Sequence, residues 1–198
     1  MEDAMDVKTI ISILVMGFFV FQPLSLTAGE IVNSVVVTAK GKPLTLLGNE
    51  VKIGDTAPNA ILLANDLSEF DISKTTGIRV FTTVPSLDTQ VCDRQVHRFN
   101  EEAAKLPNVF IYAISADLPF AQKRWCGAAG IKNVMTLSDH REMAFADAWG
   151  VHIKESRLLA RAVFVVDSAG KIVYREIVKE MSHEPDYEKV LEALKTAK

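Results

Sequence analysis

The feature that most constrains the fold is a change of sequence period across residues 84–92. Residues 78–84 are a β-branched run of the kind found in a central strand. Beyond the loop, apolar positions recur at helical spacing and so share one helical face. These positions are Cys92, Val96, Phe99 and Ala103. The sequence therefore predicts a strand, a short loop and a helix, with a cysteine in the buried stripe near the helix start.

The rest of the chain repeats this alternation of strands and helices. Further strands are expected at 60–63, 108–115 and 134–137, and further helices at 117–127, 141–149 and 186–197. Two strand pairs frame them, 35–38 with 44–47 around Gly41-Lys42-Pro43, and 162–166 with 172–178 around Asp167-Ser168-Ala169-Gly170. This pattern predicts one α/β domain, residues 29–198, with a central sheet, helices on both faces and an N-terminal β-hairpin.

Composition and charge narrow the functional classes. The chain has 198 residues, 48% of them apolar, which is enough for one sizeable core. Its net charge is −3, and three acidic residues and one basic residue fall within residues 1–28, so the remainder carries −1. A nearly neutral domain lacks the basic surface that a nucleic-acid partner requires. The four histidines show no spacing with cysteine that would hold zinc, so we expect no metal site and no cofactor.

The first 28 residues differ in composition from the rest. Residues 9–21 are an almost unbroken apolar run of 13, followed by Gln22-Pro23 and by small residues up to Ala28. The run is short for a membrane span and suits the apolar region of an export signal peptide, with cleavage after Ala28. This segment contains one lysine and three acidic residues, whereas an export signal begins with a positively charged stretch. The alternatives are therefore an uncleaved anchor or a start codon placed too early. The expected location is periplasmic or otherwise exported, and cytoplasmic if the segment is not a working signal.

The position of Cys92 favours a reactive thiol. A thiol attacks a peroxide as the thiolate, and an ordinary cysteine, with a reference pKa of about 8.5, is mostly protonated at neutral pH. If Asp88 or Thr89 caps the helix, the sulfur lies in the first turn, where free N–H groups and the helix dipole stabilise negative charge by about 0.3 to 1 kcal/mol. Thr89 can also place its hydroxyl against the sulfur or the peroxide, and Pro85 fixes the loop.

A cation is also needed, because the helix dipole alone is too weak. Arg94 lies two positions after the cysteine and therefore points about 200° around the helix, away from the sulfur. We interpret Arg94, His97 and Arg98 as a solvated face. The better candidate is Arg161, at the start of a β-branched strand, since an arginine at a strand end can reach a neighbouring strand–helix junction.

The other cysteine, Cys126, follows Cys92 by 34 residues. The helix that opens at Asp117-Leu118-Pro119, with a cap residue and an early proline, is expected to stop near Gly127, which places Cys126 at its frayed end. A sulfenic acid on Cys92 can condense with this thiol to a disulfide, and closing that bond would require helix ends to unwind. The alternative is a structural disulfide, which for a loop of this length stabilises a domain by about 3 to 4 kcal/mol. The helix-start position, with a threonine three residues earlier and a proline seven residues earlier, favours the reactive interpretation.

These residues resemble the active-site loop of the peroxiredoxins, which reads proline, three residues, threonine or serine, two residues, cysteine. Here the motif is Pro85, Thr89 and Cys92. The chain is similar, more narrowly, to the thiol peroxidase branch, and this likeness spans about residues 33–196. It is carried by Pro85-Ser86-Leu87-Asp88-Thr89, by residues 115–122 running on to Cys126-Gly127, and by Ala160-Arg161-Ala162.

The resemblance implies a thioredoxin-like fold and the reduction of hydroperoxides. It implies that Cys92 is the peroxidatic cysteine, that Cys126 is the resolving cysteine, and that Arg161 and Thr89 donate hydrogen bonds to the sulfur and the peroxide. It also implies a homodimer that is reduced by thioredoxin and favours alkyl hydroperoxides, in keeping with three apolar residues near the loop. These are Val84, Leu87 and Phe120.

An exported form would need another reductant, because it would not meet the cytoplasmic thioredoxin pool. An envelope thiol-disulfide carrier is the expected partner in that case. Two other functional classes remain open to the residues themselves. A disulfide oxidoreductase of the same fold is disfavoured, because positions 89 and 95 are Thr and Gln and no Cys-x-x-Cys pair is present. The other is a non-catalytic exported domain with one structural disulfide.

Overall fold

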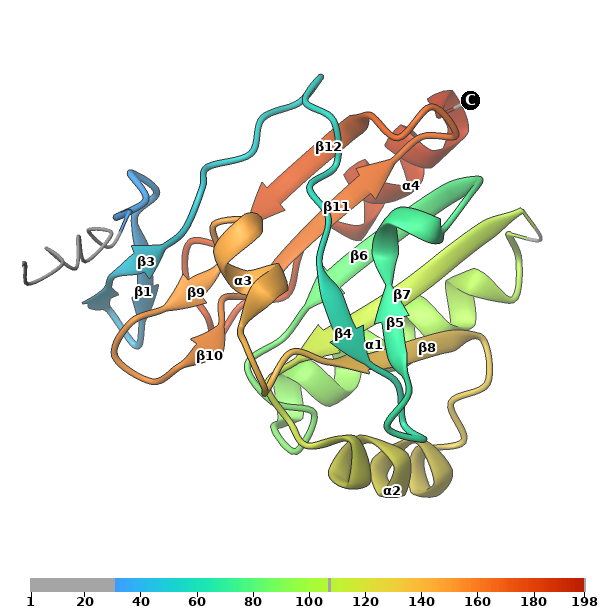
Figure 1. The fold of residues 1–198 in the computed structure, drawn as a ribbon, viewed down its shortest axis with the longest axis horizontal. Helices are drawn as coiled ribbons and strands as arrows, with labels where there is room; N and C mark the ends of the chain where they lie inside the picture. The colour runs from blue at the N-terminus through green and yellow to red at the C-terminus, as the bar shows by residue number, and fades with distance from the viewer. Residues whose placement is uncertain (1–30, 107, 198) are drawn as a thin grey trace, which may run out of the picture.

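The computed structural model describes residues 31–106 and 108–197, and its centre is a mixed sheet of seven strands (Figure 1). The strand order is β12-β11-β6-β7-β8-β4-β5. In chain order the strands are β4 (Ile61–Leu63), β5 (Glu69–Asp71), β6 (Ile78–Thr83), β7 (Val109–Ser115), β8 (Val134–Ser138), β11 (Ala162–Val166) and β12 (Ile172–Ile177). β6, β7 and β8 are parallel, and the others pair antiparallel with their neighbours. The predicted central sheet is confirmed, with β5 as an addition.

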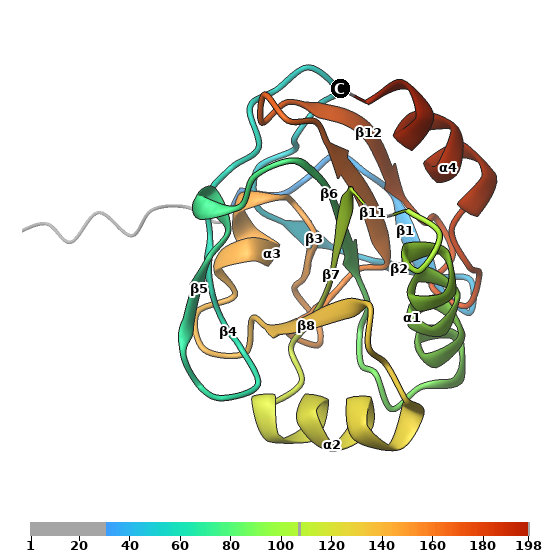
Figure 2. The same cartoon turned by 90° about the vertical axis from the view of Figure 1, so that its right-hand side faces the viewer.

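Helices cover both faces of this sheet (Figure 2). α1 (Gln90–Ala103) and α4 (Tyr187–Thr196) pack on one face, where their apolar side chains join those of β6, β7 and β11. α3 (Ala144–Ala148) packs on the other face through the buried ring of Phe145, which stacks on Trp149. α2 (Pro119–Ala129) lies beside β8. Because α1 connects β6 to β7, its first residues follow the carboxyl end of β6, at the centre of the sheet.

The predicted N-terminal β-hairpin is present, but its turn differs from the prediction. β1 (Val37–Ala39) and β2 (Lys42–Leu44) are joined by Lys40 and Gly41, whose φ angles of 50° and 74° suit a tight hairpin turn. The Glu180 carboxylate accepts a hydrogen bond from each of these two backbone N–H groups at 3.0 Å. These bonds hold the pKa of Glu180 well below its usual range and fasten the hairpin to the segment that contains Met181.

A second, three-stranded sheet was not predicted. It consists of β3 (Leu46–Leu47), β9 (His152–Ile153) and β10 (Leu158–Leu159), with β9 in the middle. Strands of two residues are too short to show an alternating pattern, and β3 pairs with a strand more than a hundred positions away. Residues 46–47, predicted to belong to the hairpin, pair with β9 instead.

Two helix boundaries also differ from the prediction. α3 begins at Ala144, not Arg141, because the Asp139 carboxylate accepts hydrogen bonds from two backbone N–H groups, those of Phe145 at 3.1 Å and Ala146 at 2.8 Å. α2 continues to Ala129 and ends at Gly130, whose φ of 67° is the left-handed conformation that closes many helices. It therefore ends beyond the predicted position near residue 127.

Predictions about apolar residues had mixed outcomes. The sequence pattern assigns Phe99, Phe110, Phe145 and Trp149 to the core. Phe99, Phe145 and Trp149 are buried, but Phe110 is 53% exposed on β7, so its assignment to the core was wrong. The predicted export signal, residues 1–28, lies outside the described residues. Within the two described ranges, no helix is long and apolar enough to cross a membrane.

Candidate active site

The sulfur of Cys92 lies in the first turn of α1. Thr89 is the residue before the helix, and Cys92 is its third residue and fully buried. Its side chain belongs to the apolar cluster between α1 and the sheet, as the helical spacing predicted. The free N–H groups of a first helical turn and the helix dipole both favour a negative charge at this position.

The Thr89 side chain contacts the sulfur of Cys92 and does not cap the helix. Its hydroxyl lies 2.7 Å from Cys92 Sγ and 3.1 Å from the carbonyl oxygen of Ser86, and its single proton can be donated to either of them. It accepts no capping hydrogen bond from the helix backbone. Thr89 therefore occupies the predicted cap position, while its hydroxyl is aimed at the sulfur.

Arg161 reaches the same sulfur from the neighbouring strand. Ala162 of β11 pairs with Thr83 of β6, so the antiparallel register sets Arg161 beside the end of β6, where the loop to α1 starts. The guanidinium donates from Nη2 to Cys92 Sγ at 3.5 Å. Its Nε and Nη2 donate to the carbonyl oxygen of Met181 at 3.1 and 3.0 Å, and its Nη1 donates to Gln95 Oε1. Four donors are thereby fixed in one orientation.

Arg161 is a buried cation that has no carboxylate partner in the described part of the chain. Its side chain is 2% exposed, and its hydrogen-bond acceptors there are a carbonyl oxygen, an amide oxygen and the cysteine sulfur. Glu184 is held instead by Arg94, whose Nε donates to it at 2.9 Å on the half-exposed outer side of α1. This confirms the interpretation of Arg94 as a solvated residue. A buried positive charge is costly without a counter-charge, and a Cys92 thiolate supplies one.

The loop before α1 is held by a residue that the sequence reasoning did not select, Asp117. Its carboxylate accepts hydrogen bonds from the Ser86 hydroxyl and the Leu87 N–H, both at 2.8 Å, and from the Ser115 hydroxyl. Asp117 was expected to cap α2, but Leu118 occupies the cap position. Pro85 lies half-buried at the start of this loop, so its contribution is to the path of the chain and not to the sulfur contacts.

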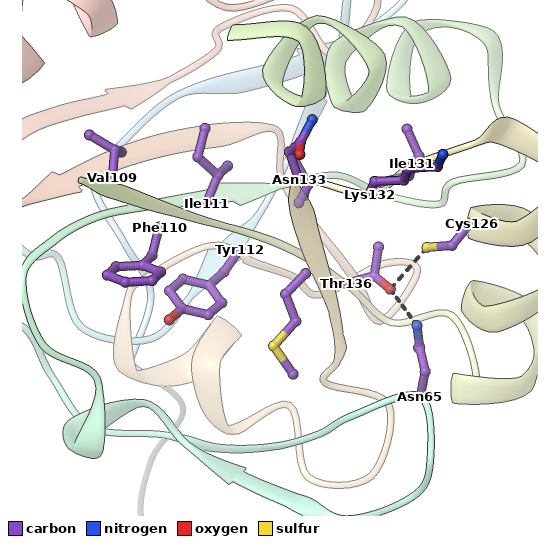
Figure 3. A pocket seen from close by; sticks show the side chains of 12 residues that line it. Asn65, Val109, Phe110, Ile111, Tyr112, Cys126, Ile131, Lys132, Asn133 and Thr136 are labelled. Carbon is purple, nitrogen blue, oxygen red and sulfur yellow. Dashed lines mark hydrogen bonds between the residues drawn. The ribbon is translucent and has the colours of Figure 1, made fainter. Parts of the chain in front are cut away.

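Cys126 lies within the last turn of α2 and is not frayed. Its carbonyl oxygen accepts hydrogen bonds from the backbone N–H groups of Gly130 and Ile131. The half-buried thiol lies 3.3 Å from the hydroxyl oxygen of Thr136 on β8, beside an open pocket (Figure 3). Both cysteines are free in this structure.

One hydrogen bond links the two cysteine-bearing helices. Trp125 Nε1, next to Cys126, donates to Asp93 Oδ1, next to Cys92, at 3.0 Å. The His97 ring lies against the edge of the Trp125 ring. Trp125 thus connects α2 to α1.

A buried cysteine in the first turn of a helix, set between a threonine hydroxyl and an arginine, defines a thiol enzyme of the redoxin class. The profile of the Redoxin family matches residues 52–191. The thiol peroxidase of Bacillus subtilis (strain 168) is 58% identical over 160 residues, which are 80% of this chain and 96% of that protein. The thiol peroxidase of Halalkalibacterium halodurans is 55% identical over 162 residues, 81% of this chain and 98% of that one. A solved peroxiredoxin-like protein from Aquifex aeolicus is 40% identical with a TM-score of 0.78, over 84% of this chain and 98% of that chain.

The chain belongs to the thiol peroxidase family of the peroxiredoxins. It has the thioredoxin-like fold with a mixed sheet and an N-terminal hairpin, and its activity is the thiol-dependent reduction of hydroperoxides. The family predicted from the motifs is therefore confirmed. The two competing classes, a protein disulfide oxidoreductase and a non-catalytic exported domain, are set aside.

Proposed function

We propose that Cys92 is the thiol that reacts with the peroxide and that Arg161 and Thr89 activate it. The observation that carries this proposal is the buried Arg161 guanidinium, which donates a hydrogen bond to the sulfur of Cys92. The thiolate attacks one peroxide oxygen, the O–O bond breaks, and its electron pair leaves with the other oxygen as alkoxide or hydroxide. Protonation of that oxygen gives an alcohol or water, and Cys92 is left as sulfenic acid. The donors that face the sulfur also stabilise the charge on the leaving oxygen.

The second step of the proposal is resolution by Cys126. Its thiol condenses with the Cys92 sulfenic acid, forming the disulfide and releasing water. Cys92 is enclosed between α1 and the sheet, while Cys126 contacts Thr136 on β8, so the two sulfurs have separate surroundings. A disulfide needs its sulfurs about 2.05 Å apart. The first turn of α1 must therefore unwind, alone or with the end of α2, before the bond closes.

A single-turnover measurement tests this function. The fully reduced protein is mixed with one equivalent of cumene hydroperoxide, peroxide loss is followed by stopped flow, and free thiols are counted at the end. We expect rapid consumption and the loss of both thiols in each chain. Consumption at the rate of an ordinary thiol would show that Cys92 is not activated, and loss of one thiol alone would remove Cys126 from the cycle.

The link between Trp125 and Asp93 is expected to slow disulfide closure. Because it holds the first turn of α1, which must unwind before the disulfide closes, its removal in W125F should speed closure by about three- to tenfold, the effect of one hydrogen bond to a partly exposed carboxylate. Rapid acid quench with mass spectrometry measures the conversion of sulfenic acid to disulfide. E101Q, an exposed change on α1 away from this link, is the control. Equal closure rates in W125F and E101Q would contradict this role.

We also propose that the reductant is thioredoxin or a similar dithiol carrier, and that the location decides which. The apolar run at residues 9–21 supports export of the mature domain, residues 29–198, and therefore an envelope carrier as partner. Fractionation of cells that produce the full chain, with the mass of the mature protein, tests both points. Cytoplasmic recovery at full length would exclude export.

We further propose a homodimer that accepts organic hydroperoxides as well as hydrogen peroxide. Leu118 and Phe120, 52% and 63% exposed at the start of α2, are an apolar surface next to Asp117, which holds the active-site loop. Such residues suit either a subunit contact or an organic substrate. Val84 and Leu87, in contrast, are buried core residues. Sedimentation of the reduced protein gives the oligomeric state.

A further inference from the structure

The side chain of Thr136 lies between Asn65 and the thiol of Cys126 (Figure 3). Asn65 Nδ2 donates a hydrogen bond to Thr136 Oγ1 at 2.8 Å, and the same oxygen lies 3.3 Å from Cys126 Sγ. Thr136 is 2% exposed and points from β8 toward α2. The three side chains thus form a chain of contacts that runs from the end of β4 to the resolving thiol.

The register of the sheet explains why Asn65 is available. β4 pairs with β8 at one position, Leu63 with Ser138. Continuing this antiparallel register by two residues sets Asn65 opposite Thr136, beyond the end of the paired strand. A side-chain hydrogen bond therefore joins the two chain segments just beyond the end of their backbone pairing.

The donors and acceptors of these side chains allow Thr136 to donate to the sulfur while it accepts from Asn65. A hydroxyl has one proton and two lone pairs, and the Asn65 amide donates to one of the lone pairs. Either partner can donate in the contact between Thr136 and Cys126, the thiol to the hydroxyl oxygen or the hydroxyl to the sulfur. A thiolate has no proton, so the hydroxyl of Thr136 is then the donor, and a hydrogen bond to a charged acceptor is stronger than one between neutral groups.

The surroundings of Cys126 make such a donor necessary. Partial burial raises the pKa of the Cys126 thiol, and the hydrogen bonds of Thr136 and Asn65 act in the opposite direction. Arg161, the cation beside Cys92, donates its other hydrogen bonds to Gln95 and to the Met181 carbonyl oxygen. The neutral pair Thr136 and Asn65 is thus the local support for a negative charge on Cys126.

We propose that Thr136, oriented by Asn65, is a positioning residue that stabilises the thiolate form of Cys126 and thereby sets the rate of resolution. This inference rests on the proposed role of Cys126 as the resolving cysteine. The Cys126 thiolate attacks the sulfur of the Cys92 sulfenic acid, the S–S bond forms, and the S–O bond breaks. The departing hydroxide takes up one proton, which gives water. Slow resolution prolongs the sulfenic acid and exposes it to a second peroxide, which oxidises it to sulfinic acid.

The experiment first measures the reactivity of Cys126 alone, in C92S protein, through alkylation by monobromobimane as a function of pH. We expect T136V, which keeps the shape and the β-branch of threonine, to slow alkylation at pH 7 by about tenfold. The effect should vanish at high pH, where the thiol ionises without help. T136S keeps the hydroxyl and should remain within about twofold of the parent protein.

N65D supplies a second variant at a half-buried position that does not alter β8. The new carboxylate accepts the hydroxyl proton of Thr136 and turns it away from the sulfur, so alkylation at pH 7 should again slow by about tenfold. Unchanged alkylation profiles in both T136V and N65D would overturn the proposal.

The same substitutions in protein with both cysteines then test the rate of resolution. Acid quench should show disulfide formation slowed about tenfold at pH 7 in T136V, a normal rate in T136S, and more sulfinic acid at high peroxide in T136V. A shifted alkylation profile with an unchanged resolution rate would overturn the catalytic part of the inference. Failure of the unsubstituted protein to form the disulfide would instead refute the proposed role of Cys126, which alkylation does not depend on.

Discussion

Cys92→Ser is expected to lower peroxide consumption by a factor on the order of 10³ or more, to the background of the remaining thiol. A serine hydroxyl is not ionised at neutral pH, so the buried Arg161 would face a neutral and weakly nucleophilic oxygen. The substitution is nearly the same size and replaces a side chain in a packed cluster, so the fold should persist. Stopped-flow consumption of cumene hydroperoxide, with a thermal unfolding curve for each protein, measures both effects.

Cys126→Ser is the matched control for this result, because it removes a thiol of the same kind from a different helix. We expect it to consume one peroxide per chain at the normal rate and then stop, leaving a Cys92 sulfenic acid that dimedone traps. Only the step after peroxide reduction should be lost. Equal loss of the first turnover in both variants would contradict the assignment of the two roles.

The sequence could predict those parts of the site that depend on local pattern. The helical spacing after residue 89 placed Cys92 in the first turn and on the buried face, and the strand pair that ends the sheet suggested Arg161 at a strand end. It could not select Gln95 or Asp117, because their roles depend on partners far along the chain. Gln95 lies three residues after Cys92 and therefore on the buried face of α1. A polar residue at such a position was the one feature of the sequence that could have indicated its contact with Arg161.

The errors in the fold have the same physical origin. α3 is shorter than predicted because the Asp139 carboxylate, which precedes the helix, accepts hydrogen bonds from the backbone N–H groups of Phe145 and Ala146. The spacing of apolar residues in the sequence cannot show such a contact. Phe110 is exposed although β7 lies in the middle of the sheet, since burial depends on what covers each end of a strand. The hydrogen bond from Trp125 to Asp93 joins two helices, and the apolar spacing within each helix cannot predict it.

Arg161→Met is expected to slow the reaction with peroxide by about 10²- to 10³-fold, the cost of removing one oriented donor from a charge-stabilising site. Two effects combine, since the thiolate loses its buried counter-charge and the leaving oxygen loses a donor. Methionine is long and flexible enough to fill the volume of the arginine stem. Stopped-flow rate constants for the two proteins with cumene hydroperoxide measure this change.

Two further variants separate the charge from the position of Arg161. Arg161→Lys keeps the charge but has no planar fork, so it cannot bond Gln95, the Met181 carbonyl oxygen and the sulfur together, and we expect an intermediate loss of about tenfold. Arg94→Gln removes an arginine that is two residues from Cys92 but directed to Glu184 on the surface, and its rate should stay within about threefold of the parent protein. If R94Q lost as much as R161M, the effect would come from the general positive potential around α1. A loss confined to R161M would show that the oriented contact with the sulfur is what activates the thiol.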